Sequence, residues 1–250
     1  MKNVTKFLSV LFLCFSFLFA GCSCKNENEE ETTEEKIDFS NYTYMVFGDS
    51  ITYGAEYSNG YNQMKIPYDV GVKNILNLKS TINKGISGAT YTSNNYGLVS
   101  MSDVITSTSE KADIISVMGG VNDFNRNLPL GDSDDRDITT IYGALHTTMG
   151  FLKENYPNAY IFYITPYKED YSGMLWSRDN NQGYNLEDVS NAIKEVASIY
   201  QIDVLDLFTF GGFEIVMNNP DCDGIHPNQD FILEKTAPQI AAFIENNFNK

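Results

Sequence analysis

Short apolar runs alternate with helix-like periodicities along most of the chain. The runs are rich in β-branched and aromatic residues, and unbroken runs of this kind are typical of strands buried on both faces of a parallel sheet. They predict five strands, at Tyr42–Phe47, Thr81–Ile86, Ala112–Met118, Ala159–Ile164 and Ile202–Leu207.

Between the strands, apolar residues recur at steps of three and four, the spacing that predicts helices. One helix spans Leu186–Tyr200 after Asn185, whose side chain can cap its first turn. Another covers roughly Asp230–Asn247, where Pro238 starts or kinks it. A third pattern consists of Ile138, Ile141, Leu145, Met149 and Leu152. The alternation predicts one α/β domain over residues 37–250, with a parallel sheet covered by helices on both faces.

The first 21 residues are predicted to be a signal peptide rather than part of the fold. Lys2 and Lys6 flank the start of an apolar run over Phe7–Ala20, which has the length of a secretory h-region and is short for a membrane-spanning helix. Phe19–Cys22 resembles a bacterial lipobox, with phenylalanine where leucine is usual. The resemblance implies cleavage before Cys22, lipid on its thiol, and an extracytoplasmic protein anchored to a bacterial membrane. Ordinary secretory cleavage and an uncleaved anchor are the alternatives.

Residues 22–36 are predicted to be an acidic tether between the lipid and the domain. The segment holds six glutamates and no apolar residue able to anchor a core. Loss of the two signal-peptide lysines changes the formal net charge from −16 to −18. Like charges extend such a segment and hold the domain away from an anionic membrane surface.

Composition narrows the class of protein further. With 17 Lys and Arg against 33 Asp and Glu, the chain is a poor match for nucleic acid, and 42% hydrophobic residues exclude disorder throughout. Once Cys22 carries lipid, Cys24 and Cys222 remain, and neither a CxxC pair nor a histidine cluster suggests a metal site. Four aspartates between 132 and 137 lack a calcium-loop spacing and indicate a solvated loop. His146 falls within a helical pattern and is interpreted as structural or exposed.

Four polar blocks follow predicted strands, and ligands bind at the carboxyl ends of strands in such sheets. In Phe47–Thr52, a glycine permits a tight turn before Ser50, and a following helix would direct its N-terminal dipole at the hydroxyl. In Asn83–Thr90, Gly85 or Gly88 can offer a bare backbone N–H to a ligand. Each of these two blocks alone is also an ordinary turn sequence.

The other two blocks supply an amide and an imidazole. Met118–Asp123 contains Asn122, whose side-chain amide is a neutral donor for a developing oxyanion. Asp223–Asn228 places Asp223 three residues before His226, a spacing at which a carboxylate can orient the ring. Each block alone is ambiguous, whereas four of them in this order, each at a predicted strand end, indicate one catalytic site.

Together the four blocks resemble the SGNH hydrolases, also called GDSL esterases and lipases, over nearly all of residues 42–250, including Asn125–Gly131. The resemblance implies a flavodoxin-like, three-layer α/β/α sandwich around a five-stranded parallel sheet. It also implies a serine esterase that needs no metal or organic cofactor. The nucleophile would be Ser50, the general base His226 and its partner Asp223. The implied oxyanion donors are the backbone N–H groups of Ser50 and Gly88 and the side chain of Asn122.

Three points stay open at the level of sequence. Asp221 could supply the orienting carboxylate, although the Asp-x-x-His spacing favours Asp223. Gly85 could replace Gly88 as the backbone donor. Phe231 occupies a position that is often glycine in related sequences, which alters local packing without changing the catalytic residue types.

The sequence restricts the substrate only weakly. Surface anchoring and aromatic residues near the predicted site favour esters of carbohydrate, such as O-acetyl groups, although the aromatics could equally serve packing. These aromatics are Tyr53, Tyr57, Tyr61, Tyr167, Tyr171 and Trp176. The first alternative is a lipolytic esterase or lysophospholipase of the same family. The second is a noncatalytic binding lipoprotein or nucleotide binder, in which Ser50-x-Thr52-x-Gly54 would be a phosphate loop; it has no need of Asp223 and His226. The oligomeric state is not specified.

Overall fold

The computed structural model describes residues 37–57, 60–94, 96–171, 173–215 and 222–248. At its centre is a parallel sheet of five strands, with neighbours in the order β4-β1-β5-β6-β9. The strands are β1 (Thr43–Gly48), β4 (Ser80–Gly85), β5 (Ile114–Met118), β6 (Tyr160–Ile164) and β9 (Asp203–Leu205). All five predicted strands are confirmed. The central strands β1, β5 and β6 are apolar runs buried on both faces, whereas the edge strands β4 and β9 are only partly buried.

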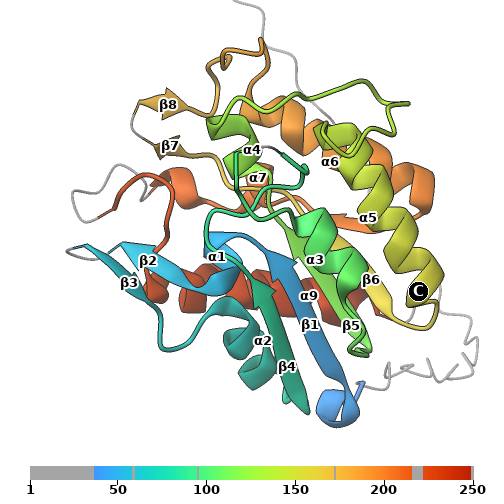
Figure 1. Cartoon of the computed structure of the whole chain (residues 1–250). Helices are drawn as coiled ribbons and strands as arrows, with labels where there is room; N and C mark the ends of the chain where they lie inside the picture. The colour runs from blue at the N-terminus through green and yellow to red at the C-terminus, as the bar shows by residue number, and fades with distance from the viewer. Residues whose placement is uncertain (1–36, 58–59, 95, 172, 216–221, 249–250) are drawn as a thin grey trace, which may run out of the picture. The chain divides into compact units, whose positions relative to one another are not determined.

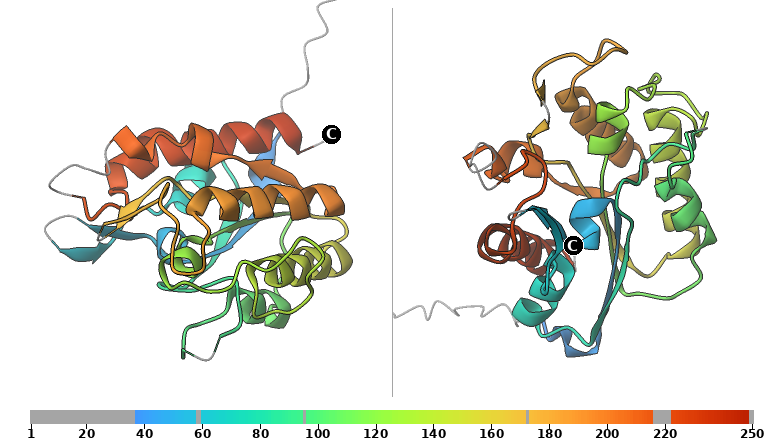
Figure 2. Two further views of the ribbon diagram at one scale, coloured as in Figure 1. Left: turned by 90° about the horizontal axis from the view of Figure 1, so that it is seen from above. Right: turned by 60° about the vertical axis from the view of Figure 1, so that its left-hand side comes forward.

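Helices cover both faces of this sheet (Figures 1 and 2). One face is covered by α2 (Tyr68–Leu76) and α9 (Ala237–Asn247), the other by α3 (Met101–Ser107), α5 (Ile141–Asn155) and α6 (Leu186–Tyr200). Alternate residues of β1 enter the two cores: Tyr44 and Val46 pack on the first side, Met45 and Phe47 on the second. All four are fully buried, so the three-layer α/β/α arrangement is confirmed.

Capping residues set where α5 and α6 begin. The side chain of Asn185 accepts backbone N–H groups at the start of α6, and Asp188 accepts the Asn185 N–H in return, which completes a capping box. The predicted helix after Asn185 is therefore confirmed. At α5, the Thr140 side chain caps a helix that begins at Ile141. Ile138 fits the apolar spacing but lies before the cap and outside the helix, which corrects the predicted start.

The last helical segment is regular at both ends and widened in the middle. It consists of α8 (Gln229–Phe231), a π-helical turn η3 (Ile232–Thr236) and α9. In the π turn, the Ala237 N–H donates to the Ile232 carbonyl, five residues back. Pro238 stands in the first turn of α9, where its missing N–H costs least. It therefore marks the start of a regular helix inside the predicted one.

The remaining elements are short. They are η1 (Phe39–Asn41), α1 (Ser50–Tyr53), β2 (Ala55–Tyr57), β3 (Tyr61–Gln63), α4 (Val121–Asn125), β7 (Asp170–Tyr171), β8 (Met174–Leu175), α7 (Leu207–Phe210) and η2 (Phe213–Ile215). β2 with β3 and β7 with β8 form antiparallel hairpins beside the carboxyl ends of the sheet (Figure 1). These hairpins are not predicted by the sequence patterns, and both contribute to the site.

The predicted signal peptide, the lipidated Cys22 and the acidic tether lie outside the described residues. Among the helices that the structure describes, none combines the length and the hydropathy needed to cross a bilayer.

Candidate active site

A tight turn holds Ser50 at the end of β1. The strand ends at Gly48, and Ser50 is the first residue of α1. The Asp49 side chain caps this helix by accepting the Ile51 N–H at 3.0 Å. A Cβ on Gly48 would lie 2.0 Å from Thr52 Oγ1, so only glycine lets strand and helix approach this closely. α1 is a single turn of four residues, too short for a large helix dipole. The tight connection between β1 and α1 is therefore what positions the Ser50 hydroxyl.

Ser50, His226 and Asp223 form one hydrogen-bonded chain. His226 Nε2 lies 2.9 Å from Ser50 Oγ, and His226 Nδ1 lies 2.7 Å from Asp223 Oδ2. The second oxygen of Asp223 accepts the backbone N–H groups of Ile225 and His226 at 3.1 and 2.8 Å. Burial acts to raise the pKa of Asp223, but the hydrogen bonds from His226 outweigh it and lower the pKa, so the carboxylate is ionised at neutral pH. Asp221, the alternative partner, lies outside the described residues.

The expected oxyanion donors gather at the same cavity as Ser50. Asn122 lies in the first turn of α4, and its Nδ2 donates one hydrogen to the Ala89 carbonyl at 3.0 Å. That bond fixes the amide and leaves the second hydrogen for a ligand. Gly88 lines the cavity with φ +80°, a conformation that favours glycine.

Gly85 has a different role from Gly88. Its N–H already donates to Asn83 Oδ1 at 2.8 Å. A Cβ on Gly85 would also lie 2.3 Å from the Tyr53 nitrogen, so glycine is needed there for the packing of β4 against α1. Gly85 is therefore engaged in local structure, and Gly88 is the better candidate donor.

The cavity beside Ser50, here called the Ser50 cavity, has a volume of about 240 Å³. It is lined by Ser50, Tyr61, Ser87, Gly88, Asn122, Asn125, Arg126, Tyr171, Ile225 and His226. Tyr61 comes from β3 and Tyr171 from β7, and their hydroxyl oxygens lie 3.5 Å apart. The ring of Tyr61 also stands edge-on to the imidazole of His226, with 5.5 Å between centroids. The two hairpins thus form an aromatic wall beside the candidate base.

The other aromatic residues singled out from the sequence do not line the Ser50 cavity. Tyr167 is buried in the core and hydrogen-bonds Thr236. Trp176 packs against the core from its edge. Tyr53 is exposed, and Tyr57 contacts the ring of Tyr61. Packing therefore accounts for Tyr167 and Trp176, and of the six aromatics only Tyr61 and Tyr171 line the Ser50 cavity.

Three buried carboxyl groups flank the site. Burial raises the pKa of Asp49 and of Asp123 to about 6, although both accept backbone hydrogen bonds that act in the opposite direction. Burial raises the pKa of Glu169 further, to about 8. One Glu169 oxygen accepts the Tyr171 N–H at 3.1 Å, so this side chain fixes the strand that carries Tyr171.

The second histidine and the acidic loop are structural. His146 is buried, and its ring nitrogens lie 3.2 Å from the Tyr200 hydroxyl and 2.9 Å from the Ser133 carbonyl. The structural interpretation of this histidine is confirmed. In the loop, the side chains of Asp135 and Asp137 accept backbone N–H groups two residues ahead. Within the described ranges, no three or more His, Cys, Asp or Glu side chains are grouped so that they could hold a metal ion.

Comparison with known proteins identifies the family. The model of the GDSL-like lipase/acylhydrolase family matches residues 46–230, which include Ser50, Asn122 and His226. The chain belongs to this family. A search of curated proteins finds no match.

Solved structures similar to this GDSL-family protein come from several bacteria. A protein from Lactobacillus plantarum is 28% identical, with a TM-score of 0.71 over 83% of this chain and 99% of the other. A possible lipase from Chitinophaga pinensis is 24% identical, with a TM-score of 0.66 over 84% and 100%. A carbohydrate acetylesterase from Sinorhizobium meliloti is 15% identical, with a TM-score of 0.59 over 83% and 98%. The last two show likeness of fold alone.

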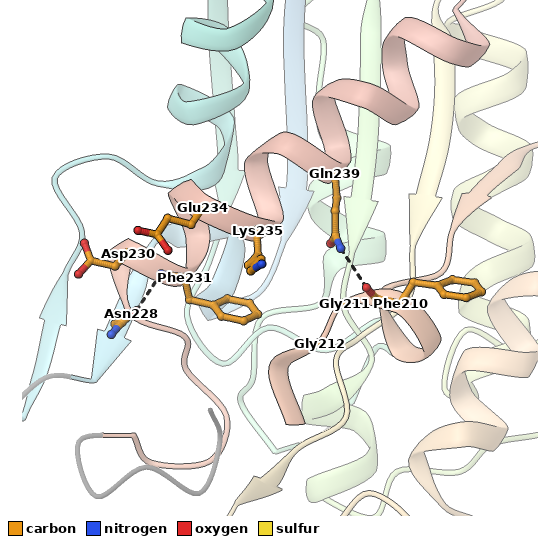
Figure 3. Close-up of a pocket in the computed structure, with 9 residues that line it drawn as sticks. All are labelled: Phe210, Gly211, Gly212, Asn228, Asp230, Phe231, Glu234, Lys235 and Gln239. Atoms are coloured by element: carbon orange, nitrogen blue, oxygen red, sulfur yellow. Dashed lines mark hydrogen bonds between the residues drawn. The ribbon is translucent and has the colours of Figure 1, made fainter. Parts of the chain in front are cut away.

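A further cavity, of about 410 Å³, lies beside α8 and the π turn and contains none of the candidate catalytic residues (Figure 3). Phe231 lines it and also packs edge-on against Tyr167 and Phe213. The aromatic side chain at this often-glycine position therefore fills space between the last helix and the loops. Phe231 does not change the candidate catalytic residues, none of which lines this cavity.

Arg126 lines the Ser50 cavity but is not among the residues that the sequence patterns predict for the site. It stands four residues after Asn122, at the position that ends α4. That spacing is the signal that could have found it. Glu169 gives no such signal, because its burial depends on tertiary packing.

Proposed function

We propose that this GDSL-family protein is a serine esterase that hydrolyses short-chain carboxylic esters, with O-acetyl groups on carbohydrate as the substrate class. The observation that supports it best is the hydrogen-bonded chain Ser50–His226–Asp223 beside the candidate oxyanion donors Gly88 and Asn122. A serine hydroxyl is a weak nucleophile at neutral pH unless a base stands within hydrogen-bond distance.

The reaction follows from this geometry. Ser50 Oγ bonds to the acyl carbon while its proton moves to His226 Nε2, and the N–H groups of Ser50 and Gly88 with the Asn122 amide hold the oxyanion. His226 then gives that proton to the leaving alcohol, which leaves an acyl-enzyme. A water molecule loses a proton to His226 and attacks the acyl carbon. The acid is released and Ser50 regains its proton.

The size and lining of the Ser50 cavity favour a small acyl group. At about 240 Å³ it is smaller than pockets that hold drug-sized ligands, which span about 300–1,000 Å³. Ile225 is its one aliphatic lining residue within the described part of the chain, so a long hydrocarbon chain would find little apolar surface. Tyr61 and Tyr171 offer ring faces and hydroxyls, which suits a sugar better than a lipid tail. A carbohydrate acetylesterase also shares the fold.

A fluorophosphonate tests the proposed chemistry directly, because it reacts only with an activated serine. We expect one phosphonyl group per chain, located on Ser50 by peptide mass spectrometry. Ser50→Ala should remain unlabelled, whereas Ser87→Ala, which removes another serine from the same cavity, should still be labelled. An unlabelled wild-type protein that hydrolyses no ester would instead favour the noncatalytic alternative.

The chain length of the acyl group separates the two enzymatic alternatives. Among 4-nitrophenyl acetate, butyrate and octanoate, we expect the highest kcat/KM for acetate. Preference for octanoate would assign the protein to the lipolytic esterases. Release of acetate from acetylated xylan by the wild type and not by Ser50→Ala would support the carbohydrate assignment.

We further propose that the protein is exported and anchored by lipid on Cys22. The charged start, the apolar run and the lipobox-like Phe19–Cys22 support this proposal. In bacterial cells given radiolabelled palmitate, we expect label in the wild type and none in Cys22→Ser. Cys24→Ser is the matched control and should keep the label. Loss of label in the control alone would contradict the assignment.

A further inference from the structure

A second cavity of about 420 Å³ adjoins the Ser50 cavity. The two share three lining residues, Asn125, Arg126 and Tyr171, so they meet along one wall. The second cavity, here called the Arg178 cavity, is also lined by Arg178 and by residues of the β7–β8 hairpin and the loop that follows it. A substrate that enters the Ser50 cavity can therefore extend past Arg126 towards Arg178.

Arginines are scarce in this chain and concentrated here. The sequence contains three, and two of them, Arg126 and Arg178, line the two adjoining cavities. A Cβ on Gly88 would lie 3.5 Å from Arg126 Nη2, so the guanidinium reaches the wall of the candidate oxyanion site. Such positive charge is unusual in a chain with a formal net charge of −16.

Neither guanidinium is neutralised by an ion pair with a described residue. Arg178 donates to the Gly173 carbonyl at 3.1 Å, which orients it without cancelling its charge. Among the described residues that line the two cavities, Asp179 is the one carboxylate, and it lies 3.5 Å from the Asn185 amide. The nearby carboxylate of Asp223 is bonded to His226. Among the described residues that line the two cavities, two positive charges thus stand against one negative charge.

Asn125 also lines both cavities. Its side chain interacts with the carboxyl group of Glu169 and acts to lower the pKa of that group. The charged donors along the two cavities are therefore the two arginines, and guanidinium groups are the donors that a carboxylate or a phosphate accepts in pairs of hydrogen bonds.

We propose that the substrate is an anionic ester, whose acyl group enters the Ser50 cavity and whose alcohol part carries a carboxylate or phosphate that Arg126 and Arg178 bind. This inference rests on the proposed esterase function and specifies the alcohol that the enzyme selects. The larger Arg178 cavity takes the larger part of a short-chain ester, which is the alcohol. The acidic surface elsewhere repels anions, so the two arginines select anionic esters at the site itself.

Matched acetyl esters test this selection on the full chain. The probes are 4-acetoxybenzoate, 4-acetoxyphenyl phosphate and the neutral methyl 4-acetoxybenzoate. For Arg126→Gln, we expect kcat/KM to fall about 10- to 100-fold on an anionic probe and less than about threefold on the neutral one, as for loss of a charge-assisted hydrogen bond. Arg178→Gln should change selectivity in the same direction. Comparison of the two anionic probes shows which oxyanion is preferred.

Three controls distinguish selection from other roles. Arg136→Gln removes the third arginine, on a loop that lines neither cavity, and should leave the ratio between anionic and neutral probes unchanged. Asn122→Ala should lower all three rates by a similar factor, as expected of an oxyanion donor. For the wild type, 1 M NaCl should reduce the preference for anionic probes.

Equal losses on all probes in Arg126→Gln would overturn the proposal, because they would assign Arg126 to the oxyanion or to the fold. Unchanged rates on every probe would overturn it too. Absence of Ser50-dependent hydrolysis of any probe would instead overturn the proposed function. The two failures are therefore distinguishable.

Discussion

Asp223→Asn should lower kcat/KM on 4-nitrophenyl acetate by about 10⁴-fold while leaving the fold intact. In the wild type, Asp223 accepts three hydrogen bonds: two from backbone N–H groups and one from the imidazole of His226. An asparagine can satisfy the backbone only with its oxygen. Its NH₂ group then faces His226 Nδ1, which must become the acceptor.

That reversal changes the tautomer of His226. The ring proton moves to Nε2, the nitrogen that lies 2.9 Å from Ser50 Oγ. A protonated Nε2 cannot take the serine proton, so the base is lost although every atom stays near its place. Circular dichroism and the unfolding midpoint should match those of the wild type, whereas the rate of phosphonate labelling at Ser50 should fall with kcat/KM.

Asp221→Asn is the matched control for this prediction. Asp221 is the nearest alternative in sequence, and the spacing Asp-x-x-His together with the 2.7 Å contact assigns the role to Asp223. We expect Asp221→Asn to keep wild-type activity. A loss of activity in Asp221→Asn, with Asp223→Asn active, would transfer the orienting role to Asp221.

The fold is largely readable from the sequence where elements are long or fully buried. The central strands β1, β5 and β6 appear as apolar runs because helices cover both faces of the sheet, whereas the edge strands β4 and β9 are partly exposed and mix polar with apolar residues. Two sequence signals predict α6: its periodic apolar residues and the Asn185 capping box. The first turn of α5 was set by the Thr140 cap rather than by the apolar spacing, which is why Ile138 falls outside.

The hairpins carry little signal of their own. β3 consists of three exposed residues, and β7 and β8 consist of two partly buried residues each. Distant partners hold the first hairpin instead: Glu56 accepts the Gln229 N–H at 3.0 Å, and the Gln229 side chain accepts the Lys65 N–H. Gln229 follows the loop of His226, so this contact links the aromatic wall to the catalytic loop. Local propensity contains none of this information.

Some residues of the site are likewise predictable from short sequence blocks, and others are not. Ser50 and Asn122 stand in short blocks just after β1 and β5, at strand ends as predicted. Asp223 and His226 lie instead in the loop before α8, separated from β9 by α7 and η2, and this loop brings His226 to Ser50. The choice between Gly85 and Gly88 needed the hydrogen bond from Gly85 to Asn83. Arg126 and Glu169 depend on which surfaces meet in three dimensions, and isolated polar residues in a sequence do not report that.

Stability of the wild type should fall as the pH rises, and Glu169→Gln should remove much of that fall. Burial raises the pKa of Glu169 from 4.5 to about 8, so between these values the folded protein keeps a proton that the unfolded chain releases. Stability from this group is therefore complete below pH 4.5 and is lost as the pH rises through 8. The slope is at most about 1.4 kcal/mol per pH unit.

The window from pH 6.5 to 8 isolates this carboxyl group from the other two. Asp49 and Asp123 contribute in the same direction, but their pKa of about 6 means that most of their loss occurs at lower pH. From urea unfolding of the full chain, we expect the wild type to lose about 1–2 kcal/mol across the window. Glutamine keeps an oxygen for the Tyr171 N–H and cannot ionise, so Glu169→Gln should lose much less.

Glu154→Gln is the control, because this exposed glutamate on α5 changes the net charge by the same amount. It should reproduce the wild-type slope. If Glu169→Gln also reproduces that slope, Glu169 is ionised in the folded protein and water or another group must reach its carboxylate. If the slope disappears, a neutral carboxyl group holds β7 in place, and the wall formed by Tyr171 weakens as the pH rises through 8.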